Sequence, residues 1–225
     1  MLVDIDTDRL EAALQGIDPA GERTVGWTAN VTDPADAATA VAVATSQFGR
    51  LDGLVNSAGM IRMDAAWDLT TEMWDQHLSV NVTGSFLFAK AVGEHLRRSG
   101  GGAIVNVASN CGKAGYGNMA AYNSSKAAVI GLTRSLAMEW AEDRINVNAV
   151  CPGAVETPML AKVADWLAPK VGLPVAELYD GMNPAQLGRR IFPDEVGRVV
   201  AFLLSDDATI IRGQAISIDG GDTPY

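Results

Sequence analysis

Residues 102–126, GAIVNVASNCGKAGYGNMAAYNSSK, decide the fold of this chain of 225 residues. The run 103–108 is apolar and rich in valine and isoleucine, as expected for a strand buried on both faces of a parallel sheet. A polar, glycine-containing turn follows, and residues 120–142 have the periodicity of a helix. A buried strand followed by a crossover helix is the repeating unit of α/β folds.

The same alternation of strand-length apolar runs and helical stretches extends in both directions. We expect strands at 2–4, 24–29, 51–56, 103–108, 145–150 and 214–218, and helices at 7–14, 34–48, 71–98, 120–142 and 193–204. This order predicts a Rossmann-type, doubly wound parallel sheet in three layers, α/β/α, folded as a single domain over residues 1–225.

The alternation stops between Pro152 and Pro193, where four further prolines and short helical pieces such as 159–167 occur. A segment of this length without regular structure inside a compact domain is usually functional. We therefore expect residues 154–190 to form a lid over a binding site.

Composition excludes several classes of function. The chain has 17 Lys+Arg and 27 Asp+Glu, a formal charge of -10, which repels nucleic acid and anionic membrane surfaces. No stretch is long and apolar enough to span a bilayer, and the start is acidic where a signal peptide is basic, so we expect a cytoplasmic protein. The two cysteines and the two histidines lack metal-ligand spacing, so we expect no metal site.

Polar residues or turn residues follow five of the expected strands. Asp4, Asn30, Asn56, Ser109 and Pro152 stand at or just after strand ends. Because ligands of open parallel sheets bind outside the carboxyl ends of the strands, these residues are expected to converge on one site.

Tyr122 and Lys126 are four residues apart in the expected helix 120–142, so their side chains share one helix face. A nearby ammonium favours a phenolate, and we expect Lys126 to lower the pKa of Tyr122 toward neutrality. Such a phenol would suit general acid/base chemistry on alcohols and carbonyls. Ser109, 13 residues before Tyr122, stands where its hydroxyl could bind the reacting oxygen.

Three further segments occur in the same order and at the spacing of one known family: Asn56-Ser57-Ala58-Gly59, Asn81-Val82-Thr83-Gly84 and Pro152-Gly153-Ala154-Val155-Glu156-Thr157. With Ser109, Tyr122 and Lys126, they make the chain resemble the classical short-chain dehydrogenases/reductases from about Leu2 to Gly221. The resemblance implies an NAD(P)-dependent oxidoreductase that interconverts a secondary alcohol and a ketone. The substrate stays open among sugars or polyols, hydroxysteroids and 3-oxoacyl compounds.

The resemblance also implies catalytic roles. Tyr122 would transfer the proton, Lys126 would also bind the nicotinamide ribose, and Ser109 would hold the substrate oxygen. Asn81 would keep a water that links Lys126 to solvent, although its amide could instead simply bond to backbone. Cys111, two residues after Ser109, is a candidate to face the substrate.

Cofactor roles carry over in the same way. Asn56, Ala58 and Gly59 would line the adenine ribose side and stabilise the central sheet, while Pro152, Val155 and Thr157 would hold the nicotinamide carboxamide. Asp4 matches the acidic residue that binds both ribose hydroxyls and repels a 2′-phosphate, which favours NAD over NADP. Asp4 could instead be an acid preceding a helix N-terminus. Asn30, next to Val31 at the adenine, stands where the family usually has aspartate.

The family opens with a strand, a Thr-Gly-x-x-x-Gly-x-Gly turn and a helix before the strand that here begins at Leu2, and this sequence contains no such unit. We therefore hypothesise that the functional gene product is longer, and that strands 2–4 and 24–29 would be separated from the rest of the sheet. The alternative is a catalytically impaired protein of this fold that acts as a binding or oligomer partner.

The family usually forms homodimers or homotetramers through the helices that correspond to 71–98 and 120–142. An apolar row in the second helix suits such an interface but could equally face the sheet: Val129, Leu132, Leu136 and Trp140.

Overall fold

The computed structural model describes residues 1–223 and contains six strands, all in parallel pairs. The strands are β1 (Leu2–Asp4), β2 (Gly26–Thr28), β3 (Gly53–Asn56), β4 (Gly102–Val107), β5 (Ile145–Pro152) and β6 (Ala215–Ile218). The α-helices are α1 (Thr7–Ile17), α2 (Pro34–Phe48), α3 (Thr71–His77), α4 (Gly84–Ser99), α5 (Ala120–Glu139), α6 (Pro158–Val171), α7 (Val175–Gly181) and α8 (Pro193–Leu204). Each predicted strand and helix is present, with ends shifted by a few residues.

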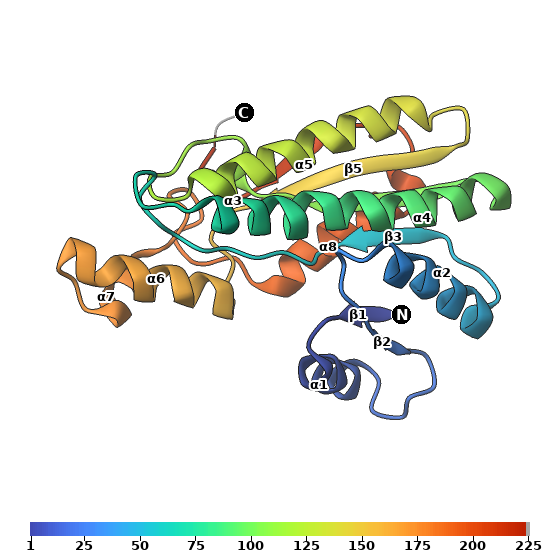
Figure 1. Cartoon of the computed structure of the whole chain (residues 1–225), viewed down its shortest axis with the longest axis horizontal. Coiled ribbons are helices and arrows are strands. Elements are labelled where there is room, and N and C mark those ends of the chain that lie inside the picture. Colours follow the sequence, from blue (N-terminus) through green and yellow to red (C-terminus); the bar gives the residue numbers. More distant parts are fainter. Residues whose placement is uncertain (224–225) are drawn as a thin grey trace.

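The strands form two sheets. Four of them pair in the order β3-β4-β5-β6, and β1 pairs only with β2. Figure 1 shows β1, β2 and α1 set apart from the main body, below the β3 edge. The predicted separation of the first two strands is therefore confirmed.

Between the two sheets lies an apolar hollow of about 480 Å³ that runs along β3 and includes Met1, Val3, Leu54 and Phe88 in its walls. The small sheet is attached to the body by apolar packing. Val3 and Trp27 lie against a cluster that contains Ala37 of α2 and Phe88 of α4. Burial of these side chains holds the two-stranded sheet in place without any strand pairing to β3.

The four-stranded sheet forms the middle layer. Helices α4 and α5 cover one face and α8 covers the other, as predicted (Figure 1). All eight residues of β5 are buried, so the strand is covered on both faces, and its two asparagines, Asn146 and Asn148, donate to the Ala208 and Ile211 carbonyls.

The apolar row of α5 faces the sheet. Val129 and Leu136 are buried, and Leu132 and Trp140 pack against the cluster formed by α4, β4 and β5. Of the two readings left open for this row, the sheet-facing one is correct.

The predicted helix 71–98 is interrupted. Residues Leu78–Thr83 form a π-helical turn, η1, between α3 and α4. A π-turn contains one residue more than the α-helical repeat, and Asn81 is the buried residue of this turn. Periodicity could not reveal it, since the apolar pattern continues through the turn.

The expected lid contains two helices, α6 and α7, rather than only short pieces. Thr157 caps α6 by accepting from the Leu160 amide at 3.3 Å. Helix α7 has no fully buried residue and packs against α6.

Candidate active site

Tyr122 and Lys126 lie in the first two turns of α5, at the carboxyl edge of the large sheet. Both are almost fully buried, with 7% and 5% of their surface exposed. The Lys126 Nζ lies 5.7 Å from the centre of the Tyr122 ring and donates to the Val107 carbonyl, at the end of β4, at 2.9 Å. Helix spacing therefore places the ammonium beside the phenol as predicted.

The predicted effect on the tyrosine is wrong. Burial raises the pKa of Tyr122 above its ordinary value, Cys111 adds to this rise, and hydrogen bonding with Ser109 acts in the opposite direction. The reason is that a phenolate is poorly solvated in this enclosed position, and burial is the largest cause of the rise. Burial also lowers the pKa of Lys126, to about 8.

Ser109 follows β4 and is buried beside Tyr122. Its Oγ accepts from the Cys111 amide at 3.1 Å and donates to Asn110 Oδ1 at 3.2 Å. The hydroxyl thus caps the short 3₁₀ turn η2 (Asn110–Gly112) and also faces the phenol. Capping fixes its position, so both roles are compatible.

Cys111 is half-buried and lies near enough to influence both Tyr122 and Lys126. Burial raises the pKa of its thiol. That Cys111 faces the substrate remains a prediction.

Asn81, in the π-turn, connects three segments. Its Oδ1 accepts from the Met60 amide at 2.8 Å, and its Nδ2 donates to the Met60 carbonyl at 3.1 Å and to Ser125 Oγ at 2.9 Å. The amide therefore pins the loop after β3 to α5. A bond to backbone, the simpler of the two predicted readings, is present, and the proposed water relay remains a prediction.

Gly59 lies within this cluster. A Cβ at Gly59 would stand 3.3 Å from Asn81 Oδ1 and 3.4 Å from Lys126 Nζ. The loop after β3, the π-turn and α5 consequently meet within van der Waals distance, which brings together three of the predicted segments.

Asn56 ends β3 and is buried. Its Nδ2 donates to the Ser85 carbonyl at 3.0 Å and to Asn106 Oδ1 at 2.9 Å, and Asn106 in turn donates to Thr133 Oγ1 at 2.9 Å. This chain of bonds joins β3, β4, α4 and α5, in agreement with the predicted role of Asn56 in the sheet. The following residues, Ser57 and Ala58, line the hollow beside β3.

The loop after β5 carries the next predicted group. Pro152 is buried at the strand end, and Thr157 Oγ1 donates to the Val155 carbonyl at 3.2 Å. Gly153 approaches the C-terminal segment so closely that a Cβ would stand 2.9 to 3.0 Å from three atoms of Asp219.

The small sheet carries the remaining predicted residues. The Asp4 carboxylate is exposed at the end of β1 and accepts from the Asp6 amide at 2.9 Å, while Asp6 itself caps α1. Asn30 Oδ1 accepts from the amide of Thr32 at 3.0 Å, and Val31 lies against Gly84 at the start of α4. Val31 therefore connects this sheet to the body, and the Asp4 side chain remains free for other contacts.

Two neighbours of Ser109 were not predicted. Asn110 is buried and its Nδ2 donates to the Tyr116 hydroxyl at 3.1 Å, so that Tyr116 stands in the loop that leads to α5. An aromatic residue between the glycines of this loop, Gly115-Tyr116-Gly117, is the signal that could have identified it.

Among residues 1–223 no cluster of three or more His, Cys, Asp or Glu could hold a metal ion. The described helices also include none that is long and apolar enough to cross a membrane.

Comparison with known proteins agrees with this geometry. Residues 1–223 match the family model described as enoyl-(acyl carrier protein) reductase. The chain is 36% identical over 223 residues to D-threitol dehydrogenase of Mycolicibacterium smegmatis, covering 98% of this chain and 82% of the relative. It is 38% identical over 223 residues to the NAD-dependent glycerol dehydrogenase of Listeria innocua, covering 99% and 83%.

A solved structure is equally similar. The crystal structure of a variant actinorhodin polyketide ketoreductase with NADPH superposes with a TM-score of 0.93 at 34% identity, over 99% of this chain and 87% of that one. The matches reach all the segments that form the buried Ser109, Tyr122 and Lys126 group, and the chain belongs to the short-chain dehydrogenases/reductases, a family of nicotinamide-dependent oxidoreductases of alcohols and ketones.

Proposed function

We propose that this chain interconverts a secondary alcohol and a ketone with NAD, using Tyr122 as the group that gives and takes the proton. The observation that carries the proposal is the burial of Tyr122 between Ser109 and Lys126 at the carboxyl edge of the sheet. A phenol, a hydroxyl and a cation in one enclosed position can bind a carbonyl oxygen and supply it with a proton.

In reduction, Ser109 and Tyr122 would donate hydrogen bonds to the substrate oxygen, and Tyr122 would pass its proton to that oxygen as carbon accepts hydride. In oxidation, Tyr122 would take the proton back. The raised pKa of Tyr122 keeps the phenol protonated and ready to donate. During the reaction the nearby Lys126 ammonium would stabilise the phenolate left behind. The nicotinamide, when bound, supplies or accepts the hydride.

The residues present suit the nicotinamide end of such a cofactor. Because Gly59 has no side chain, the space next to Lys126 Nζ stays free, whereas a larger residue at this position would fill it. Lys126 would bind the ribose hydroxyls, and Pro152, Val155 and Thr157 would hold the carboxamide. Asn56, Ala58 and Gly59 would line the adenine ribose side, with Asn30 and Val31 near the adenine.

Titration of the purified chain with NADH tests the proposal. Enhanced nicotinamide fluorescence at micromolar NADH, together with turnover on a panel of polyols, hydroxysteroids and 3-oxoacyl thioesters, is the expected result. The panel also decides among these substrate classes. If no binding occurs at millimolar NADH or NADPH, the chain is instead a binding or oligomer partner of this fold.

We further propose a preference for NAD, which rests on the exposed Asp4 carboxylate at the end of β1. Asp4→Ser should reduce the ratio of kcat/KM for NADH over NADPH by about tenfold, because the like-charge repulsion of a 2′-phosphate is lost. Asp8→Asn, an exposed acid in the first turn of α1, is the matched control and should leave the ratio unchanged. An unchanged ratio in the Asp4 variant would mean that Asp4 does not select the cofactor and only accepts the hydrogen bond from the Asp6 amide.

Association is also proposed, as a homodimer or homotetramer. Phe86 of α4 and Met138 of α5 are 40% and 80% exposed on helices that flank the sheet. Light scattering coupled to gel filtration should give a multiple of the 23.6 kDa chain mass, and charged residues at both positions should give the monomer. Cys111 and Cys151 are free, which suits the reducing cytoplasm that we propose as its compartment.

A further inference from the structure

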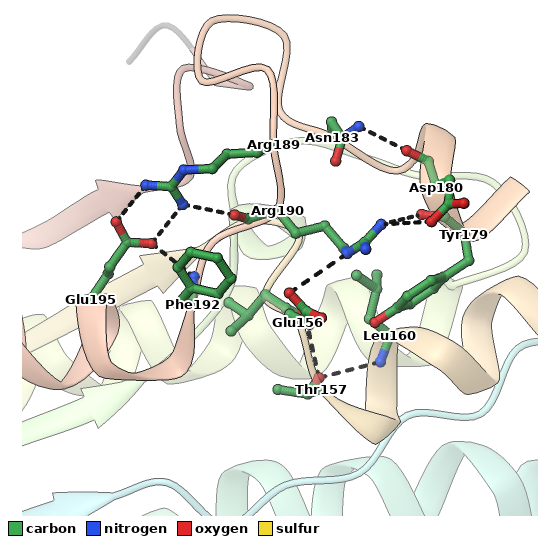
Figure 2. A network of polar contacts seen from close by, with 11 residues as sticks. Glu156, Thr157, Leu160, Tyr179, Asp180, Asn183, Arg189, Arg190, Phe192 and Glu195 are labelled. Atoms are coloured by element: carbon green, nitrogen blue, oxygen red, sulfur yellow. Dashed lines mark hydrogen bonds and ion pairs between the residues drawn. The ribbon is translucent and has the colours of Figure 1, made fainter. Parts of the chain in front are cut away.

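Two adjacent arginines at the end of the lid segment 154–190, just before α8, point in opposite directions (Figure 2). Arg189 forms a two-pronged bond with Glu195 of α8, from Nη1 to Oε2 at 2.9 Å and from Nη2 to Oε1 at 2.7 Å. Arg190 turns instead toward the lid, and its side chain is only 18% exposed. Arg189 thus connects the end of the lid segment to α8, and Arg190 connects it to α7.

The backbone around Arg190 is attached to the loop after β5. The Ile191 amide donates to the Ala154 carbonyl and the Glu156 amide donates to the Ile191 carbonyl, each at 2.9 Å. This bridge pairs Val155 with Ile191, and Val155 lies two residues before Thr157, the N-cap of α6. The backbone next to Arg190 is therefore held against the loop 154–157, which carries the proposed carboxamide-binding residues.

The Arg190 side chain reaches the last turn of α7. Its Nη1 donates to the Tyr179 carbonyl at 2.9 Å and lies 3.5 Å from Asp180 Oδ1, and its guanidinium stands 4.3 Å from the centre of the Tyr179 ring. These contacts satisfy a carbonyl at the helix C-terminus and place a positive charge where the helix dipole favours one. Stacking of the planar guanidinium on the ring adds to the attraction.

Helix α7 needs such an attachment. It has seven residues, none of them buried, and a helix of that length is not stable in water by itself, so α7 depends on its packing against α6 and on the Arg190 contacts. Asn183 Nδ2 also donates to the Asp180 carbonyl at 2.7 Å, but this bond is local to the end of α7, whereas the Arg190 contacts come from the residues just before α8.

One donor of the Arg190 guanidinium, the Nε that faces Glu156, has no acceptor within hydrogen-bond distance in the described residues. This Nε is buried, and the nearest acid, Glu156 Oε2, is 4.0 Å away. A buried donor left without an acceptor costs free energy, so this side of the Arg190 contact is weaker than the side that faces α7.

We propose that Arg190 is a positioning residue, a latch that holds α7 against the loop 154–157 and so sets the closed position of the substrate lid. The proposal rests on the proposed function for its effect on catalysis, but not for its structural content. Arg190 lies outside the Ser109, Tyr122 and Lys126 group and acts only through α7 and the loop.

Hydrogen exchange measured by mass spectrometry tests the latch without any need for activity. In Arg190→Met, amides in residues 175–183 should exchange about tenfold faster or more, because local opening of α7 becomes easier, while α5 and α8 stay protected. Arg190→Lys, which keeps the charge but not the planar stack, should give an intermediate rate. Arg198→Met is the matched control, because Arg198 pairs with Asp194 on exposed α8 and does not reach the lid.

Unchanged exchange in residues 175–183 of Arg190→Met would overturn the proposal, and so would an equal rise across the whole chain. In the active enzyme, KM for the ketone should rise about tenfold in Arg190→Met with kcat within about twofold, and Arg190→Lys should recover part of the loss. A fall in kcat at unchanged KM would also overturn it. If the chain shows no turnover, the exchange result alone decides the role of Arg190, whereas the turnover assay decides the proposed function.

Discussion

The Lys126 ammonium lies 5.7 Å from the centre of the Tyr122 ring, and its hydrogen bond goes to the Val107 carbonyl at 2.9 Å. The two side chains are therefore neighbours, and Lys126 also joins α5 to the end of β4. Burial dominates both groups, raising the pKa of the phenol and lowering that of the ammonium. The following expectations depend on this arrangement and on the contacts around it.

Tyr122→Phe should lower kcat by about 10²- to 10⁴-fold, because it removes the proposed proton donor while keeping the ring in its packed position. Tyr116→Phe, which loses only the bond from Asn110, is the control and should retain most of the activity. Steady-state kinetics at saturating cofactor measure the difference. Equal losses in both variants would argue against a special role for Tyr122.

The phenol itself can be followed by its absorbance. Because the pKa of Tyr122 is raised by burial, wild type and Tyr122→Phe should show the same tyrosinate absorbance near 295 nm up to about pH 11. A difference between them that develops near pH 8 would show that Lys126 does lower the pKa of the phenol.

Lys126 should make stability depend on pH. Its folded-state pKa of about 8 lies below the ordinary value of 10.5, so above pH 8 the unfolded chain binds the extra proton and the free energy of unfolding rises with pH. Urea unfolding should show wild type gaining up to about 3 kcal/mol relative to Lys126→Met between pH 7 and pH 10.5. A constant difference between the two across this range would contradict the lowered pKa.

Asn81→Asp should destabilise the fold by about 2–4 kcal/mol, because the Nδ2 bonds to Met60 and Ser125 are lost and a charge is buried beside Met60. Asn30→Asp, on an exposed turn, is the matched substitution and should change the free energy of unfolding by less than about 0.5 kcal/mol. Urea denaturation compares the two variants. Similar small effects would mean that the amide of Asn81 is not needed to join the loop to α5.

Gly153→Ala should cost about 1–3 kcal/mol, because its Cβ would meet backbone and Cβ atoms of Asp219 at 2.9 to 3.0 Å. Gly131→Ala, in the interior of α5 with nothing within 4 Å of its Cβ, should instead stabilise by about 0.5–1 kcal/mol. Thermal unfolding measures both changes in stability. If Gly153→Ala had no effect, the segment around Asp219 would be able to move away from the added methyl group at little cost.

The order of strands and helices followed from the sequence because it depends on local pattern. Valine- and isoleucine-rich runs such as residues 103–108 and helical periods such as 34–48 are local signals, and the carboxyl ends of parallel strands necessarily meet at one edge. The residues Ser109, Tyr122 and Lys126 could be identified for the same reason, since a strand end and a four-residue helical spacing place them together.

Tertiary structure alone decided how those residues behave. The pKa of Tyr122 depends on enclosure by several segments, and no spacing in the chain reports how much solvent reaches a side chain. The π-turn at Asn81, the helix α7 and the direction of Arg190 likewise depend on contacts between residues far apart in sequence. The sequence by itself determined which groups meet at the sheet edge, and packing determined their charge, their orientation and the position of the lid, because burial and long-range contacts exist only in the folded chain.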